Sequence, residues 1–223
     1  MDTKLLTTAL IKVISGFLIM ALLIFLPAGT LAYAQGWILL AILFIPMVIA
    51  GFVMFFKNPD LLRKRLNAKE EQAEQKTVVL LSAAIFIASF ILAGLNYRFE
   101  WCILPMWASI AGAAVFIAAY IMYAEVIREN TYLSRTIEVQ EGQKVVDTGL
   151  YGIVRHPMYT STIFLFLAMP IVLGSLISFA VMLLYIPIIA KRIRNEEQVL
   201  EQGLPGYTEY KQKVRYRLFP RLW

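Results

Sequence analysis

The chain has 223 residues, of which 60% are hydrophobic and only 16% are charged. Soluble domains have roughly 45–50% apolar and about 25% charged residues, so this composition excludes an ordinary soluble protein. The net charge of +6 does not indicate nucleic-acid binding, because basic loops held in the cytoplasm give membrane proteins the same excess. A single cysteine excludes an intrachain disulfide and a cysteine-based metal cage, and we predict no metal site.

Six apolar segments follow one another along the chain. Most of them approach the roughly 20 residues that a helix needs to cross a bilayer. We therefore predict an all-α fold, a polytopic membrane helical bundle with about six spans that forms a single integral membrane domain over residues 1–223. The predicted segments are residues 10–31, 36–56, 77–95, 104–126, 158–172 and 175–190.

The last two segments are separated only by Leu173, Gly174 and their neighbours, which predicts a tight helical hairpin. Residues 158–172 give about 22 Å of helix, against a hydrocarbon core of about 30 Å. Either this hairpin does not fully cross the bilayer, or its entrance lies below the membrane interface.

Lysine and arginine residues occur in alternate connections. They are frequent in residues 57–76, 128–155 and 191–221, and nearly absent from the connections between these regions. The positive-inside rule then predicts an integral multi-pass membrane protein whose termini are both cytoplasmic.

The linker between the fourth and fifth segments contains the one strand pattern. Residues 136–139 and 144–147 flank Glu141-Gly142-Gln143, which predicts a small cytoplasmic β-hairpin. The basic linker of residues 58–76 favours a helix along the membrane surface, with Leu61, Leu62 and Leu66 on one side. Beyond the sixth segment, good helix formers predict a C-terminal helical tail.

The only histidine stands where the polar linker re-enters an apolar segment, in Arg155-His156-Pro157. Proline is favoured at the first position of a helix, which makes His156 the N-cap. Free N–H groups and the helix dipole attract an anion there, and Tyr159 lies one turn inside. The alternative is that these are ordinary solvated residues of a membrane boundary.

Glu196 and Glu197 follow Arg192 where the chain leaves the sixth segment. Viewed alone, the pair fits a solvated helix end with intrahelical ion pairs. A hairpin rising 1.5 Å per residue, however, returns the chain to the level of His156 near residue 190, so the two clusters should be neighbours. A ligand with an anionic end, a cationic centre and hydroxyls would suit both. S-adenosylmethionine fits this description, although a phospholipid headgroup or a nicotinamide nucleotide shares some of the features.

At these residues the chain resembles the isoprenylcysteine carboxyl methyltransferase family and its relatives, the phospholipid N-methyltransferases. The resemblance covers roughly residues 120–223. One departure is Ser161, where the family often has glycine. The resemblance is carried by Gly149-Leu150-Tyr151, residues 154–159, Arg192-Ile193 leading to Glu196-Glu197, residues 206–210, Val214 and residues 217–220, with Asn130 and Ser134 in the linker.

The resemblance implies an S-adenosylmethionine-dependent methyltransferase, acting on a lipophilic or lipid-linked acceptor at the cytoplasmic leaflet by carboxyl O-methylation or lipid N-methylation. Its partners would be that substrate and membrane lipids, with no nucleic acid and no metal. Residues 105–223 would form the cofactor-binding catalytic half, after the N-terminal spans of residues 1–104. The implied catalytic residues are Arg155 and Arg192, and the implied cofactor-binding residues are Gly149, Tyr151, Val154, His156, Pro157, Tyr159, Glu196 and Glu197.

Two alternatives stay open at this point. A sterol-type membrane reductase using NADPH has a similar C-terminal hairpin architecture. A non-enzymatic membrane scaffold or carrier is the alternative from another class, although few ionisable residues lie within the spans, which disfavours an ion-coupled carrier.

Overall fold

The computed structural model describes residues 2–66, 73–133, 137 and 139–223. Four long helices make up its first half: α1 (Thr3–Ala28), α2 (Ala34–Lys57), α4 (Ala73–Phe99) and α5 (Met106–Glu129). The shorter elements are α3 (Pro59–Leu66), the 3₁₀ helix η1 (Gly149–Gly152), α6 (Pro157–Val172), α7 (Leu176–Met182), α8 (Tyr185–Gly203) and α9 (Tyr207–Lys213).

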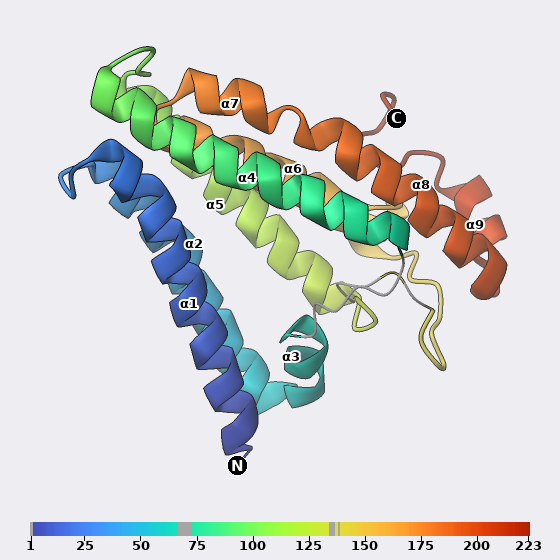
Figure 1. Ribbon diagram of the computed structural model, residues 1–223. Coiled ribbons are helices and arrows are strands. Elements are labelled where there is room, and N and C mark those ends of the chain that lie inside the picture. Colours follow the sequence, from blue (N-terminus) through green and yellow to red (C-terminus); the bar gives the residue numbers. More distant parts are fainter. Residues whose placement is uncertain (1, 67–72, 134–136, 138) are drawn as a thin grey trace.

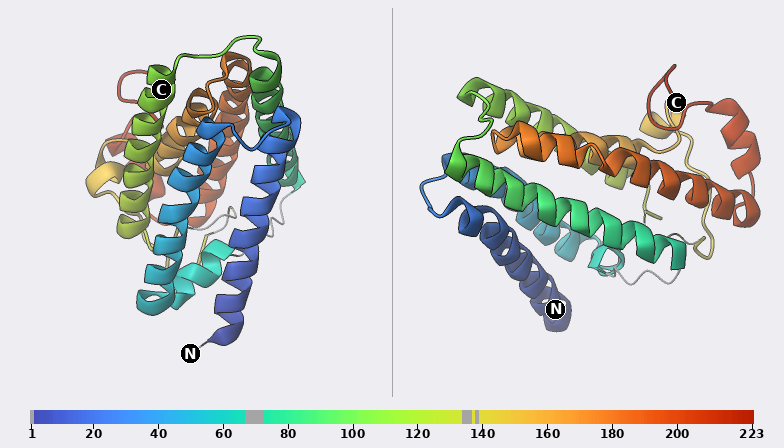
Figure 2. Two further views of the ribbon diagram at one scale, coloured as in Figure 1. Left: turned by 90° about the vertical axis from the view of Figure 1, so that its left-hand side faces the viewer. Right: turned by 45° about the horizontal axis from the view of Figure 1, so that its top comes forward.

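The helices form one elongated bundle from which the α1–α2 pair diverges toward the N-terminus (Figures 1 and 2). Helix α6 packs along α5, and α4 lies between α1 on one side and α7 on the other. The largest core cluster joins α1, α2, α4, α5 and α6 through fully buried side chains such as Ile24, Leu39 and Phe116. This packing holds α6, which carries the histidine motif, in the middle of the bundle.

Within the described residues, five helical segments are long and apolar enough to cross a membrane, which makes the chain an integral multi-pass membrane protein. They correspond to the first four predicted spans and to the sixth, which extends over Leu176–Gly203. The fifth predicted span is α6, a shorter apolar helix of 16 residues. The predicted hairpin turn is present at Gly174, which adopts the left-handed φ of 69°.

The sixth predicted span is interrupted at Leu183 and Leu184, between α7 and α8. Pro187 explains this position, because its nitrogen cannot donate to the carbonyl four residues earlier, at Leu183. That carbonyl instead accepts a hydrogen bond from the N–H of Ile186, three residues later, at 3.1 Å. The interruption lets α8 continue toward the charged end of the bundle.

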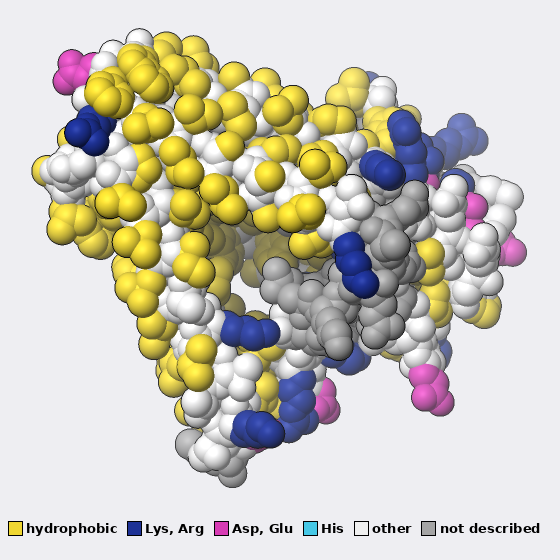
Figure 3. All heavy atoms as spheres, viewed as in Figure 1, with side chains coloured by type: hydrophobic (Ala, Val, Ile, Leu, Met, Phe, Trp, Pro, Cys, Tyr) yellow, Lys and Arg dark blue, Asp and Glu magenta, His cyan; other side chains and the backbone are white. Residues whose placement is uncertain are grey.

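The connections alternate between the two ends of the bundle. At one end the Tyr33 hydroxyl donates to the carbonyl of Leu173, and the N–H of Leu104 donates to the carbonyl of Gly174 at 2.8 Å. The N-terminus, α3, the α5–α6 linker and α9 lie toward the opposite end (Figure 1). Lysine and arginine side chains gather there, whereas hydrophobic side chains cover the long helices (Figure 3).

The predicted β-hairpin is wrong. No strand occurs in the part of the chain that the structure describes, and the fold is all-α; residues 136 and 138 of the first predicted strand lie outside that part. The turn itself is present, because the N–H of Gln143 donates to the carbonyl of Gln140 at 3.0 Å. Val139 and Val145 pack against a cluster from α8 and α9, so burial against helices replaces the cross-strand pairing that the pattern suggested.

Candidate functional site

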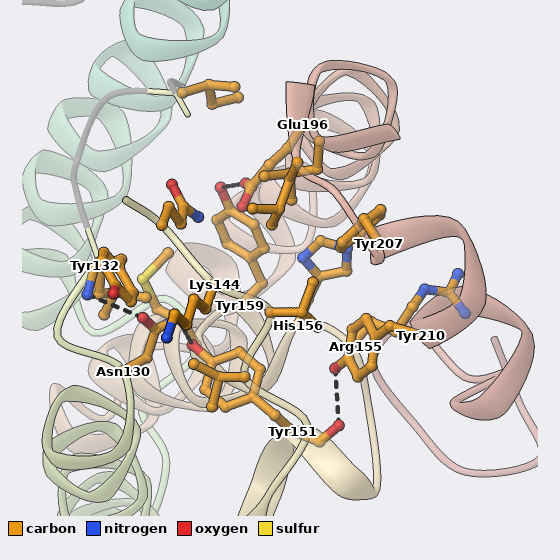
Figure 4. A pocket seen from close by; sticks show the side chains of 18 of the residues that line it. Asn130, Tyr132, Lys144, Tyr151, Arg155, His156, Tyr159, Glu196, Tyr207 and Tyr210 are labelled. Atoms are coloured by element: carbon orange, nitrogen blue, oxygen red, sulfur yellow. Dashed lines mark hydrogen bonds between the residues drawn. The ribbon is translucent and has the colours of Figure 1, made fainter. Parts of the chain in front are cut away.

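A cavity lies at the charged end of the bundle, among the α5–α6 linker, the start of α6, α8 and α9 (Figure 4). About 830 Å³ of space free of protein atoms lies in it and at its mouth, a figure that includes open solvent. The predicted site residues among its lining are Tyr151, Arg155, His156, Tyr159, Arg192 and Glu196. The remaining predicted residues lie around it.

The start of α6 has the predicted geometry. His156 is the N-cap, with a non-helical backbone, and Pro157 is the first helical residue, where its missing N–H costs no intrahelical hydrogen bond. The Nε2 atom of His156 lies 3.2 Å from Oε1 of Glu197 in α8. The predicted proximity of the histidine turn and the acidic pair is therefore present.

A second contact between α6 and α8 involves the other glutamate. The buried hydroxyl of Tyr159 donates to Oε2 of Glu196 and accepts a hydrogen bond from Nε of Arg192 at 3.0 Å. Arg192 also donates from Nη1 to Oε1 of Gln75 at 2.9 Å. Gln75 is buried in α4 and no sequence motif pointed to it; the predicted catalytic half of residues 105–223 leaves it out.

Glu197 occupies a buried ionic cluster. Its side chain is 3% exposed, and Oε1 accepts a hydrogen bond from Nε of Arg155 at 2.8 Å and forms an ion pair with Nη2 of the same residue at 2.7 Å. The other oxygen accepts from Nε of Arg217 at 2.9 Å. Two guanidinium groups and His156 thus surround one carboxylate, and Glu197 is not among the described residues that line the cavity. This geometry favours a structural role for Glu197, and its predicted contact with a cofactor stays a prediction.

The C-terminal segment is fastened across the start of α6. The Arg155 Nη1 atom donates to the carbonyls of Val214 and Arg215, both at 2.7 Å. The backbone N–H groups of Arg155 and His156 also donate to carbonyls of residues 216 and 217, each at 2.9 Å. The Arg155 guanidinium thus contacts protein acceptors through all three of its nitrogens, which favours a positioning role, and its predicted catalytic role stays a prediction.

Tyr151 forms another wall of the cavity. Its hydroxyl accepts a hydrogen bond from Nδ2 of Asn130 at 3.0 Å, and its carbonyl accepts one from the Tyr210 hydroxyl at 2.8 Å. Burial raises the pKa of the Tyr151 phenol, so this hydroxyl stays protonated at neutral pH. Asn130 and Tyr210 were noted only as parts of a resembling motif, and the structure brings both to the cavity.

Besides Glu197, three more predicted cofactor-binding residues, Gly149, Val154 and Pro157, are not among the described residues that line the cavity. Val154 and Pro157 are buried and support the turn. Ser161, which replaces a common glycine, is also buried and donates within α6 to the carbonyl of Met158 at 2.7 Å. Ser134, another residue of the resemblance, lies outside the described residues.

Gly149 has a role in the turn that the sequence did not specify. It adopts a left-handed φ of 51°, and an added Cβ would lie 1.5 Å from Oε1 of Glu129. The other oxygen of this carboxylate accepts a hydrogen bond from the N–H of Leu150 at 3.1 Å. The absence of a side chain at Gly149 thus leaves room for the Glu129 carboxylate, which stabilises the turn that carries Tyr151 by its hydrogen bond with Leu150.

Replacing Gly149 by alanine should therefore lower the free energy of unfolding by about 2–3 kcal/mol. About 1–2 kcal/mol comes from left-handed backbone, and the rest from displacement of the Glu129 hydrogen bond. Gly142→Ala is the matched control, because Gly142 has a φ of 70° with no described atom within 4 Å of its added Cβ. Thermal unfolding in detergent should show the larger loss for Gly149→Ala; equal losses would contradict the role given to Glu129.

This chain is similar to a known protein sequence and to a solved structure. Delta(14)-sterol reductase TM7SF2 of Mus musculus is 30% identical over 91 residues, which are 40% of this chain and 22% of that protein. The chain thus aligns with about a fifth of the length of that relative. The structure of a eukaryotic intramembrane Ras methyltransferase, ICMT, covers 96% of this chain and 85% of its own, with 16% identity and a TM-score of 0.49.

The family comparison falls on the region that builds the cavity. Residues 110–202 match the model of the isoprenylcysteine carboxyl methyltransferase (ICMT) family. The matched region runs from α5 to the end of α8, and it includes η1, the histidine turn and both glutamates. The chain is therefore similar to the ICMT family over residues 110–202, which are less than half of its length.

Proposed function

We propose that this protein is an S-adenosylmethionine-dependent methyltransferase that acts on a lipophilic or lipid-linked acceptor. The observation that carries this proposal is the meeting of α6 and α8 at one cavity. There Tyr159 and Glu196 are hydrogen-bonded, and His156 and Arg192 also line the wall. The family match spans the same residues.

The chemistry of the cavity lining fits the proposed cofactor. Glu196 offers a carboxylate to a cationic centre or to hydroxyl groups, and Arg192 and Lys144 offer positive charge to a carboxylate. Tyr151 and Met158 add aromatic and apolar surface. We propose that His156, Tyr159, Tyr151 and Glu196 hold the cofactor, with Gly149, Val154, Pro157 and Glu197 supporting them from outside the lining.

When bound, S-adenosylmethionine supplies a methyl group on a positively charged sulfur. The residues of this chain contribute mainly by positioning, since alignment of the reacting groups alone can lower a barrier greatly. We propose that Arg192 orients an acidic acceptor, and that Arg155 keeps residues 214 and 215 in place at the edge of the site. A carboxylate acceptor is already ionised; for an amine, Glu196 is the lining carboxylate able to take the proton.

The acceptor would arrive from the membrane. Hydrophobic side chains cover the long helices (Figure 3), and the lining of the cavity includes Met158, Leu200 and Leu204. Basic residues gather at the same end of the bundle, which favours a cytoplasmic site and cytoplasmic termini. A greasy acceptor held in the leaflet could then present its polar end to Glu196 and Arg192.

Titration of the purified protein in detergent tests the cofactor directly. We expect saturable binding of S-adenosylmethionine by calorimetry, and transfer of an isotopically labelled methyl group to a membrane lipid fraction by mass spectrometry. The labelled product would identify both the acceptor and the methylated atom. Failure to bind the cofactor, in protein that elutes as a folded species, would refute the proposal.

A second candidate is reduction of a sterol-like lipid with NADPH. The 30% identity with a sterol reductase over 91 residues favours it, although that stretch is a small part of the relative. The same titration separates the two functions when NADPH replaces S-adenosylmethionine. Selective binding of NADPH would establish the reductase candidate in place of the methyltransferase.

A further inference from the structure

Tyr207, the first residue of α9, carries a buried polar group that the contacts described so far do not use. The residue is 4% exposed, and its hydroxyl has no hydrogen-bond partner among the residues that the structure describes. A hydroxyl removed from water without a partner costs free energy, and most buried hydroxyls in folded proteins are satisfied. We therefore expect this hydroxyl to form a hydrogen bond with a molecule other than the described part of the protein.

Tyr207 lines the same cavity as His156 and Glu196 (Figure 4). Its ring is held in place by the apolar cluster of Leu204, Tyr210 and Val214. Gly206, with a left-handed φ of 84°, turns the chain immediately before it. The ring is thus fixed by packing, and the residue forms part of the cavity wall.

The other tyrosines of the cavity differ from Tyr207 in one respect, because each of their hydroxyls has at least one hydrogen-bond partner in the protein. Tyr151 pairs with Asn130, and Tyr159 pairs with Glu196 and Arg192. Tyr210 and Tyr132 donate to backbone carbonyls. Among the residues described, Tyr207 is therefore the cavity tyrosine whose hydroxyl has no hydrogen-bond partner in the protein.

The protonation state of Tyr207 fixes the direction of the missing hydrogen bond. Burial raises the pKa of the phenol, and the nearby negative charges of Glu197 and Glu196 raise that pKa further. The group remains a neutral hydroxyl at physiological pH. It can therefore donate its proton to an acceptor.

We propose that Tyr207 is a ligand-binding residue whose hydroxyl donates a hydrogen bond to an oxygen or nitrogen acceptor of the molecule bound in this cavity. The inference rests on the proposed function, which makes S-adenosylmethionine that molecule. It assigns a direct contact to α9, an element outside the family match over residues 110–202. The helix then completes the cofactor site in addition to packing against α8.

Tyr207→Phe tests the inference, because it removes the hydroxyl and keeps the ring. The affinity for S-adenosylmethionine should fall about 3–10-fold, the usual effect of one hydrogen bond. The thermal midpoint without ligand should stay the same or rise, since an unsatisfied polar group has been removed. The matched control is Tyr210→Phe, which loses a hydrogen bond to the carbonyl of Tyr151 and should lower the midpoint of the ligand-free protein.

The outcomes separate this inference from the proposed function. Wild-type protein that binds no S-adenosylmethionine overturns the proposed function, and the inference with it. Wild-type protein that binds the cofactor, with a Tyr207→Phe variant of equal affinity, overturns the inference alone. A lower ligand-free midpoint for Tyr207→Phe, or failure of this variant to fold, shows that the hydroxyl has a structural partner and also overturns the inference.

Discussion

Glu197→Ala is expected to destabilise the folded protein by about 3–5 kcal/mol, the usual effect of removing one partner from a buried ion pair. The substitution leaves the guanidinium groups of Arg155 and Arg217 without their shared carboxylate. It also releases His156 from its contact with that carboxylate. Thermal unfolding in detergent should show a large drop in the midpoint, together with loss of monodisperse protein.

Glu201→Ala is the matched control for this prediction. Glu201 lies on the same helix and pairs with Lys211, but both side chains are about one-third exposed. Such a pair contributes at most about 1 kcal/mol. Similar losses of stability for the two variants would contradict the structural role of Glu197.

Glu196→Gln is expected to weaken binding of S-adenosylmethionine roughly 10–150-fold with little change in stability. This range corresponds to about 1.5–3 kcal/mol for a hydrogen bond to a charged group. Glutamine keeps an oxygen that can accept from Tyr159, so the contact between α6 and α8 persists while the negative charge is lost. Calorimetric titration of the variant and the wild type gives the two dissociation constants.

The comparison of the neighbouring glutamates sharpens this test. Glu196 lines the cavity, whereas Glu197 is enclosed by cations outside its lining. We therefore expect one variant to lose affinity and the other to lose stability. An unchanged affinity in Glu196→Gln would exclude this carboxylate from the cofactor site, whatever the result at Glu197.

The features that were predictable from the sequence depend on local rules. Proline at the first helical position identified His156 as the N-cap. The rise of a helical hairpin brought Glu196 and Glu197 back to the level of that turn. These predictions hold because each depends on a few consecutive residues and on standard helix geometry.

The features that were not predictable depend on contacts between distant segments. Adjacent residues of a helix point about 100° apart, so the sequence could not say which glutamate faces the cavity until the position of Arg217 was known. Gln75 reaches Arg192 from a helix 117 positions away in sequence. The β-pattern of residues 144–147 failed for the same reason, because Val145 packs against α9.

The hydrogen bonds from Arg155 and His156 to residues 214–217 have a consequence for biosynthesis. Residues 214–217 come after the apolar helices in the sequence, so they are synthesised after the membrane spans. A nascent chain halted before residue 214 would hold Arg155 and Glu197 without the segment that encloses them. The start of α6 can therefore be covered by this segment only after the last apolar helix has been synthesised.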